Sequence, residues 1–239
     1  MTEKLSDEFQ DIKDNLEEIE EKISIAAEKS GRKREDIILL AATKTVDTDR
    51  INYAISCGVK YIGENRVQEL ESKIEKIDRE KTKIHLIGPL QSNKINKILP
   101  IADMIESIDS IKLAERISNR CLTLSKKMPV LLEVNIANEE SKFGFPAEQL
   151  TDVCYELSEL KGISIEGIMT VPPFDSTPSE NRKYLSRINQ IFVDIQAKKI
   201  DNVNMNILSA GMSGDYEMAI EEGSNLVRIG SSIFGRRQY

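Results

Sequence analysis

The stretch Ile37-Ile38-Leu39-Leu40-Ala41-Ala42-Thr43-Lys44-Thr45 decides the fold, because its pattern returns along the chain. It is apolar nearly throughout, which is typical of a parallel strand covered by helices. Similar short apolar runs recur at residues 59–62, 84–87, 103–108, 130–136, 163–169, 204–208 and 225–229. Stretches with one polar face lie between them, at roughly 48–57, 65–79, 91–99, 110–127, 147–160, 179–198 and 214–222. Strands that alternate with helices in this way predict eight βα units and an α/β fold.

Eight βα units form either a closed (β/α)8 TIM barrel or a large open, doubly wound sheet. The open sheet normally binds a dinucleotide at a glycine-rich turn after its first strand. Here residues 43–47 follow the first strand and contain no glycine, and neither GxGxxG nor GxxxxGK[ST] occurs in the chain. We therefore expect a closed barrel over residues 37–239, and a single domain over 1–239.

The first 30 residues have a different pattern from the rest. Apolar residues recur there with spacings of four and three among acidic residues and lysines: Leu5, Phe9, Ile12, Leu16, Ile19, Ile23 and Ala26. This spacing predicts an extra N-terminal amphipathic helix over 1–30 that ends near Ser30-Gly31. The stripe could form a coiled coil with a second chain. We favour packing against the helix's own domain, and hence a monomer over a dimer.

Composition excludes several classes of function. The chain has 33 Lys+Arg, 40 Asp+Glu, a net charge of −7 and one histidine. An acidic chain is poorly suited to nucleic acid or to an anionic membrane, and one histidine excludes a histidine-rich metal site. Cys57, Cys121 and Cys154 form no CxxC pair and are expected to be small core residues in a reducing compartment. The N-terminus is charged, and no apolar run approaches the roughly 18 residues of a membrane span. These features predict a cytoplasmic protein.

Three features at the predicted strand ends suggest chemistry, because barrel sites lie at the C-terminal ends of the strands. The first is Lys44, at the end of the first strand. A partly desolvated lysine near another cation has a lowered pKa and can form a Schiff base. A lysine that leans out into solvent explains the same position equally well.

The second feature is the pair of turns after the last two strands, where barrels frequently bind phosphate. Gly211, Ser213 and Gly214 follow the seventh strand, and residues 230–232 (Gly-Ser-Ser) follow the eighth. Glycine lets the backbone approach an anion closely, and serine suits a helix start. Ordinary turn and capping roles are the alternative, and two acidic residues nearby, Asp215 and Glu217, would compete with an anion.

The third feature is Arg228, which lies inside an apolar strand. A charge there must be paired or bound to a ligand, and Glu133 or Glu166 could be the partner of a buried ion pair. Together, the lysine, the phosphate-binding turns and the arginine describe a pocket for pyridoxal 5′-phosphate. The lysine would hold the aldehyde, the turns the phosphate, and the arginine the ring nitrogen.

Two other polar features are given structural roles. His85 has apolar neighbours and is expected to be a buried imidazole, hydrogen-bonded near the pocket, rather than a general base. Asn93, Lys94 and Lys97 form a small basic patch. We favour a solvated face there over an auxiliary site for phosphate or cofactor transfer.

From about residue 16 to Tyr239 the chain resembles the pyridoxal phosphate homeostasis proteins, which are single-domain relatives of the alanine racemase N-terminal barrel. The resemblance rests on seven motifs: residues 41–45 (AATKT), 62–65 (IGEN), 85–94 (HLIGPLQSNK), 133–135 (EVN), 167–170 (GIMT), 208–215 (LSAGMSGD) and 228–235 (RIGSSIFG). It implies a barrel of the fold type III kind and a Schiff base at Lys44. It also implies contacts to the cofactor by five further residues, which are Asn65, Ser213, Arg228, Gly230 and Ser231. No catalytic residue and no metal ligand is implied.

The resemblance implies cofactor binding, buffering or delivery, with PLP-dependent apoenzymes as recipients, rather than a defined reaction. An arginine that faces the pyridine nitrogen leaves that nitrogen unprotonated and weakens the ring as an electron sink. Related racemases take a second base from a C-terminal β-domain, for which we expect no residues here. The alternatives are a PLP-dependent enzyme with weak racemase-type activity and a barrel that binds another phosphate ligand.

Overall fold

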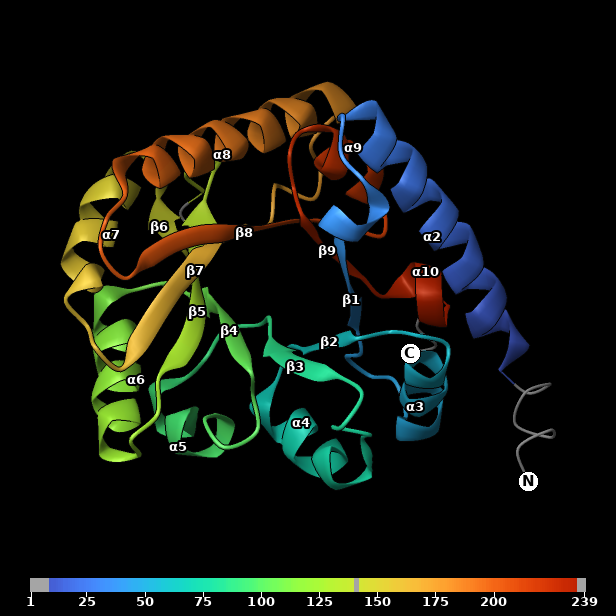
Figure 1. Ribbon diagram of the computed structural model, residues 1–239, viewed down its shortest axis with the longest axis horizontal. Coiled ribbons are helices and arrows are strands. Elements are labelled where there is room, and N and C mark those ends of the chain that lie inside the picture. The colour runs from blue at the N-terminus through green and yellow to red at the C-terminus, as the bar shows by residue number, and fades with distance from the viewer. Residues whose placement is uncertain (1–8, 140–141, 236–239) are drawn as a thin grey trace.

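Figure 1 shows the computed structural model, which describes residues 9–139 and 142–235. Within those ranges the barrel strands are β1 (Ile38–Ala42), β2 (Tyr61–Glu64), β3 (Lys83–Leu86), β4 (Met104–Ile108), β5 (Met128–Asn135), β7 (Ile163–Thr170), β8 (Val203–Met212) and β9 (Leu226–Ile229). Each strand pairs in parallel with the next one in this order, and β9 pairs with β1. The sheet therefore closes on itself, and the expected (β/α)8 TIM barrel is confirmed.

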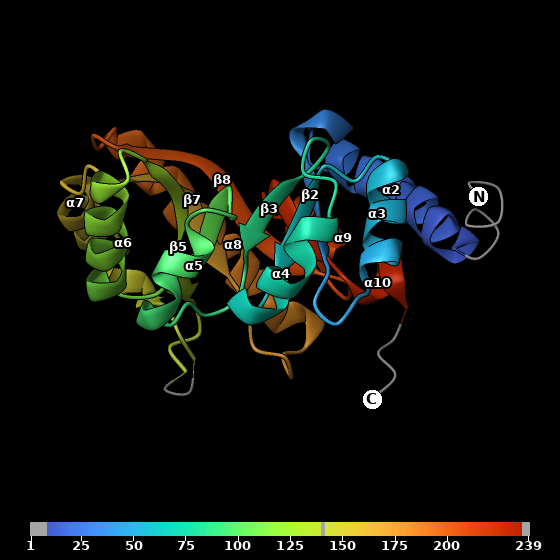
Figure 2. The same ribbon diagram turned by 90° about the horizontal axis from the view of Figure 1, so that it is seen from below.

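Helices form the outer layer around the strands (Figure 1). The α-helices are α2 (Gln10–Lys29), α3 (Thr48–Ser56), α4 (Val67–Lys73), α5 (Ile95–Ile98), α6 (Ile111–Thr123), α7 (Leu150–Ser158), α8 (Pro178–Lys198), α9 (Tyr216–Glu221) and α10 (Ser231–Phe234). Short 3-10 turns are η1 (Arg34–Asp36), η2 (Ile74–Lys76), η3 (Ser92–Lys94) and η4 (Ala147–Gln149). Figure 2 shows α6, α5, α4 and α3 following one another around one side of the barrel. None of the helices in the described ranges combines the length and apolar character that a membrane crossing requires.

The core has two parts, because successive strand residues point to opposite faces. A small cluster formed by Met104, Leu131, Met169 and Ile207 comes from four strands and fills part of the barrel interior. A larger aliphatic cluster lies between the strands and the surrounding helices. Polar side chains on strands that do not pair, such as Glu106 on β4 and Ser209 on β8, meet inside the barrel.

The N-terminal helix packs on its own barrel, as expected. Its apolar stripe from Ile12 to Ala27 is buried in the larger core cluster, and α2 lies across α9, α10 and α3 (Figure 1). Arg32, just after the helix, donates to the carbonyl oxygens of Gly223 and Ser224 at 3.2 and 2.9 Å. Leu5, which belongs to the predicted stripe, lies outside the described residues.

Two details differ from the sequence-based expectation. Cys121 and Cys154 are buried, but the prediction of a buried Cys57 was wrong: this residue is exposed at the C-cap of α3. A short extra strand, β6 (Phe145–Pro146), also pairs with the end of β5. Two residues are too few to give a periodic signal in the sequence.

Candidate functional site

A cavity of about 1100 Å³ opens at the C-terminal ends of the strands. Its lining includes all six residues singled out in the sequence: Lys44, Asn65, Ser213, Arg228, Gly230 and Ser231. Residues 171–174, in the loop between β7 and α8, form part of its rim. Figure 2 shows this loop projecting below the strands. The structure thus brings together side chains that are up to 187 positions apart in the chain (44 to 231).

Lys44 and Asn65 enter this cavity from the ends of neighbouring strands. Lys44 lies two residues beyond β1, is half-buried and lines the cavity. Asn65 follows β2 directly. Its backbone is packed closely by Gly88, where an added Cβ would lie 2.3 Å from the Asn65 carbonyl oxygen. Only glycine fits at position 88, and this close contact fixes where Asn65 stands.

The two turns after β8 and β9 are in direct contact at the edge of the cavity. The Ser213 hydroxyl accepts from the backbone N–H groups of Gly230 and Ser232, both at 3.3 Å. These two N–H groups therefore converge on one point beside the cavity, as donors for an anion would. Asp215 does not compete for that point, because its carboxylate accepts from Met212 N at 2.6 Å and from Asn181 Nδ2 at 2.9 Å.

Arg228 is almost completely buried, at 4% exposure, and is held by a chain of polar groups inside the barrel. It donates to the Ser209 hydroxyl and to the carbonyl oxygen of Thr170, the latter at 2.9 Å. The Ser209 hydroxyl in turn donates to Glu106 Oε2 at 2.6 Å. Burial lowers the pKa of the guanidinium, and the nearby carboxylate of Glu106 opposes that shift. The guanidinium stays charged at neutral pH.

The predicted ion-pair partners of Arg228 need correction. Glu166 was a wrong candidate, because its carboxylate accepts from Asn204 and Asn206 at 3.0 and 3.1 Å near the surface. Glu133 interacts electrostatically with Arg228, but the hydrogen-bonded chain leads to Glu106 instead. The reason is geometric: Glu106 projects into the barrel at the level of Ser209, which is the acceptor next to the guanidinium.

The pKa of the Glu133 side chain is also shifted. Burial raises its pKa to about 7, and the negative charge of Asp109 adds to the increase, while Arg228 opposes it. A carboxyl group at this position is therefore partly protonated at neutral pH.

His85 is buried and structural in its surroundings, as expected. Its Nδ1 lies 2.6 Å from Glu106 Oε1, and its ring packs edge-on against Tyr61. Burial is the largest single influence on Glu106 and acts to raise its pKa, but His85, Arg228 and Ser209 together outweigh it, so the pKa is lowered. The basic patch lies outside the cavity lining, and its Lys97 pairs with Glu71 at 2.9 Å.

Comparison with known proteins places this arrangement in a family. Residues 14–238 match the model of the alanine racemase N-terminal domain. The pyridoxal phosphate homeostasis proteins of Aquifex aeolicus and Escherichia coli (strain K12) are 37% and 36% identical to the chain, over 95% and 96% of it and 98% of each relative. The chain belongs to the pyridoxal phosphate homeostasis protein family.

A solved structure of one similar protein contains the cofactor. PipY of Synechococcus elongatus, in a structure with PLP bound, superimposes with a TM-score of 0.81 at 28% identity, covering 94% of this chain and all of that one. The curated relatives of Aquifex and Escherichia bear the name of homeostasis proteins and not of an enzyme. The resemblance found in the sequence is thereby confirmed at the level of the family and of the fold.

Sequence reasoning about this family member missed Glu106 and Ser209. A signal for Glu106 was present, since it interrupts the apolar strand Met104–Ile108 as Arg228 interrupts the last strand. This signal was not used, because no local sequence pattern shows that a residue on β4 lies close to a residue on β9.

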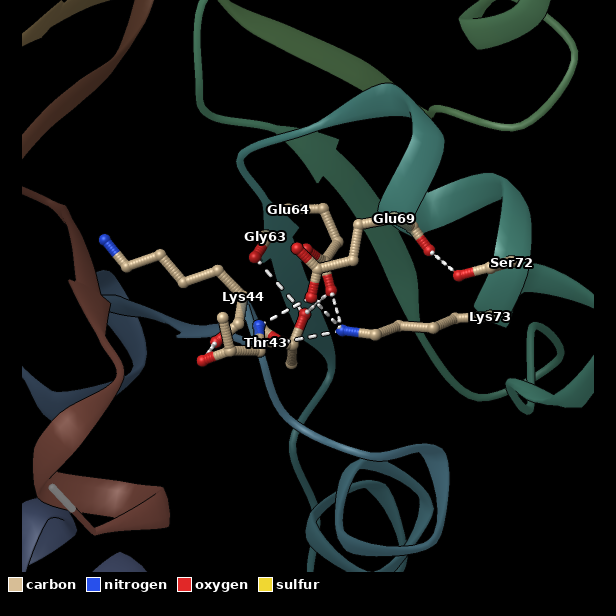
Figure 3. A network of polar contacts seen from close by, with 8 residues as sticks. Thr43, Lys44, Gly63, Glu64, Glu69, Ser72 and Lys73 are labelled. Carbon is tan, nitrogen blue, oxygen red and sulfur yellow. Dashed lines mark hydrogen bonds and ion pairs between the residues drawn. The ribbon is translucent and has the colours of Figure 1, made fainter. Parts of the chain in front are cut away.

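A second group of residues was also missed. Glu64, Glu69 and Lys73, which we call the Lys73 cluster, lie between β2 and α4 (Figure 3). Lys73 Nζ is 2.8 Å from Glu64 Oε1 and 2.6 Å from Glu69 Oε1. The four-residue spacing of Glu69 and Lys73 fits a helical pair, but the sequence does not show that Glu64 joins them.

Proposed function

We propose that this protein binds pyridoxal 5′-phosphate and serves in its homeostasis, by holding, buffering or delivering the cofactor. The observation that supports this most is that one cavity combines a lysine amine, a pair of convergent backbone N–H groups and a buried guanidinium. The donor set fits the cofactor, which carries an aldehyde, a phosphate and a pyridine nitrogen. The family membership points to the same ligand.

Each part of the cofactor has a proposed partner. Lys44 would attach covalently to the aldehyde carbon, with Asn65 beside the ring. Ser213, Gly230 and Ser231 would bind the phosphate through hydroxyl and N–H donors. The phosphate would replace the long 3.3 Å contacts that the Ser213 hydroxyl now accepts from the N–H groups of Gly230 and Ser232. When bound, the cofactor supplies an electrophilic carbon that condenses with a primary amine, and a ring that can accept electrons.

Arg228 is the reason to favour a carrier over an enzyme. A guanidinium at the ring nitrogen can donate a hydrogen bond but does not transfer its proton, because it stays charged at neutral pH. Its position is set by Ser209 and Thr170, so it cannot easily turn away. The ring nitrogen would therefore remain unprotonated, which suits retention of the cofactor more than carbanion chemistry.

The finer points of the proposal concern partners and location. We propose that PLP-dependent apoenzymes receive the cofactor, that the protein acts as a monomer, and that it works in the cytoplasm. Burial of the apolar stripe of α2 against its own barrel supports a monomer, because that stripe is not left for a second chain. The free thiols of Cys121 and Cys154 suit a reducing compartment.

The decisive experiment is borohydride trapping of the cofactor. The purified protein should absorb in the visible range after incubation with pyridoxal phosphate, and reduction followed by peptide mapping should locate the modification on Lys44. Lys44→Ala should lose the trapped adduct, whereas Lys97→Ala, a surface lysine outside the cavity, should retain it. An adduct that persists in Lys44→Ala would show that another lysine binds the cofactor.

The same preparation separates a carrier from a racemase. The protein with bound cofactor is incubated with L- or D-alanine in deuterium oxide, and proton NMR follows the α-hydrogen. The proposal expects no enzyme-dependent exchange above that of free pyridoxal phosphate. Rapid exchange of the α-hydrogen, abolished in Lys44→Ala, would favour the racemase instead.

A further inference from the structure

The peptide groups on both sides of Lys44 are held by side chains of α4. On one side, Lys73 Nζ donates to the carbonyl oxygen of Thr43 at 2.9 Å. On the other side, Glu69 Oε1 accepts from the backbone N–H of Thr45 at 2.5 Å. The two anchors are joined to each other, because Lys73 also donates to Glu69 Oε1 at 2.6 Å. The backbone on either side of Lys44 is thereby tied to the neighbouring βα unit (Figure 3).

Glu64 completes this arrangement from β2. Its Oε1 accepts from Lys73 Nζ and from the Thr43 hydroxyl, each at 2.8 Å. Glu64 is fully buried and Lys73 is 9% exposed, so the pair is screened little by solvent. A buried ion pair is a weak source of stability, because the loss of hydration offsets the attraction between the charges. Its presence directly behind Lys44 therefore points to a role other than stability.

Thr45 adds a second observation. Its φ is +65°, a left-handed backbone conformation that is unfavourable for a β-branched residue. The hydrogen bond to Glu69 holds the chain in this conformation immediately after Lys44. Strained residues of this kind are found where the surrounding structure fixes a functional group.

The direction of the side chains separates this cluster from the cavity. Figure 3 shows the side chain of Lys44 extending away from Lys73 and Glu69, while the cluster lies on the α4 side of the chain. Lys44 lines the cavity, and none of Glu64, Glu69 and Lys73 does. The cluster can therefore act on a ligand only indirectly, through the chain that it holds on both sides of Lys44.

We propose that the Lys73 cluster positions Lys44 for covalent attachment of an aldehyde ligand. It fixes the backbone at Thr43 and Thr45, so that the lysine side chain leaves the strand end toward the cavity. Glu64, Glu69 and Lys73 are thus positioning residues. The inference rests on the proposed function, since it assumes that Lys44 bonds to pyridoxal phosphate.

Two ligands distinguish positioning of the lysine from general damage to the site. Pyridoxal phosphate can bond to Lys44, whereas pyridoxine phosphate has an alcohol in place of the aldehyde and binds only non-covalently. In Glu69→Ala and Lys73→Met, the affinity for pyridoxal phosphate should fall by about tenfold or more, because misplacement of a reacting group is costly. The affinity for pyridoxine phosphate should stay within about twofold of wild type, since the phosphate-binding turns are untouched.

The matched controls lie on the same helix. Glu71→Ala removes a carboxylate two residues from Glu69, whose partner Lys97 is exposed, and should change neither affinity. Glu69→Gln keeps an oxygen that can accept from Thr45 N–H, so it should recover most of the covalent binding. Hydrogen exchange at the Thr45 amide, measured by NMR without ligand, should be faster in Glu69→Ala and close to wild type in Glu69→Gln.

Three results would overturn the inference. If the variants lost affinity for both ligands to the same extent, the cluster would only support the fold. If Glu69→Ala and Lys73→Met still gave the wild-type amount of borohydride-trapped pyridoxal phosphate, Lys44 would need no such support. If Glu69→Gln did not recover covalent binding, the hydrogen bond from Thr45 N–H to residue 69 would not be what positions Lys44. If wild type itself gave no borohydride-trapped adduct, the proposed function would fail first, and fast exchange at Thr45 in Glu69→Ala would still report the contact.

Discussion

The guanidinium of Arg228 and the carboxylate of Glu106 are connected inside the barrel through the hydroxyl of Ser209. The two charged residues come from β9 and β4, which are not neighbours in the sheet. Both are almost fully buried, so their opposite charges attract each other with little screening by solvent. This connection fixes the guanidinium at the floor of the cavity and carries its influence on to His85.

Replacement of Glu106 by Gln should destabilise the protein strongly. The amide keeps the volume but removes the negative charge of Glu106, which is the largest of the charges that compensate the buried Arg228. We expect a loss of about 3–5 kcal/mol in the free energy of unfolding. The measurement is urea denaturation at neutral pH, without ligand.

Glu166→Gln is the control for this substitution. Its carboxylate lies nearer the surface and accepts from two asparagines, so the loss should stay below about 1 kcal/mol. The double variant Glu106→Gln/Arg228→Gln should lose less than the sum of the single variants, because both charges are then gone. If the losses in the free energy of unfolding of the two single variants added up to that of the double variant, the connection through Ser209 would be contradicted.

Glu133 should make stability fall as the pH rises toward neutrality. Its pKa is about 7 in the folded protein, chiefly because of burial, against an ordinary value of 4.5. Between these two pH values the unfolded chain releases its proton first, so the unfolded state is favoured as the pH increases. Glu133→Gln removes this penalty and should be more stable than wild type above pH 7, by about 1–2 kcal/mol after allowance for solvent screening.

The pH dependence provides the control for Glu133. The advantage of Glu133→Gln should shrink as the pH is lowered, become small near pH 4.5 and vanish below it, where wild-type Glu133 is protonated in both the folded and the unfolded state. Urea denaturation at several pH values between 4.5 and 8 measures it. A difference between the two proteins that did not vary with pH would show that burial has not shifted this group.

Gly167→Ala should be far more damaging than Gly58→Ala. Both glycines have positive φ, +152° and +106° respectively, so both substitutions strain the backbone. At position 167 an added Cβ would also lie 1.8 Å from the carbonyl oxygen of Ile207, where β7 and β8 shift register. At position 58 nothing lies within 4 Å.

We therefore expect a loss of about 1 kcal/mol for Gly58→Ala and of more than about 4 kcal/mol for Gly167→Ala. Thermal unfolding and the yield of folded protein report the difference. Equal melting temperatures for the two variants would mean that the strands can move apart at this point without penalty.

The helix α2 offers a matched pair of isoleucines two residues apart. Ile23 is fully buried against the barrel, whereas Ile25 is 46% exposed. Ile23→Ala should lower the free energy of unfolding by about 2–5 kcal/mol, because it leaves a cavity. Ile25→Ala should change it by no more than about 0.5 kcal/mol. If the helix instead paired with a second chain, stability would depend on protein concentration, which dilution during unfolding tests.

Much of the candidate site could be predicted because its residues follow a local rule. Lys44, Asn65, Ser213 and Gly230 each come at or just after the end of an apolar run, and parallel strand ends meet at one mouth. The cost of a charge inside an apolar strand was enough to single out Arg228. The partner of Arg228 could not be chosen in the same way, since three glutamates on other strands were compatible with the sequence.

The sequence alone determined the order of strands and helices, the amphipathic face of α2 and the set of polar residues at the strand ends. These follow from apolar periodicity and from glycine and serine at turns, which are properties of neighbouring residues. Only the tertiary structure decided that Glu106 meets Ser209 across the barrel and that Lys73 reaches the backbone beside Lys44. Such contacts depend on barrel closure and on the register between strands, which bring together residues that no local pattern connects.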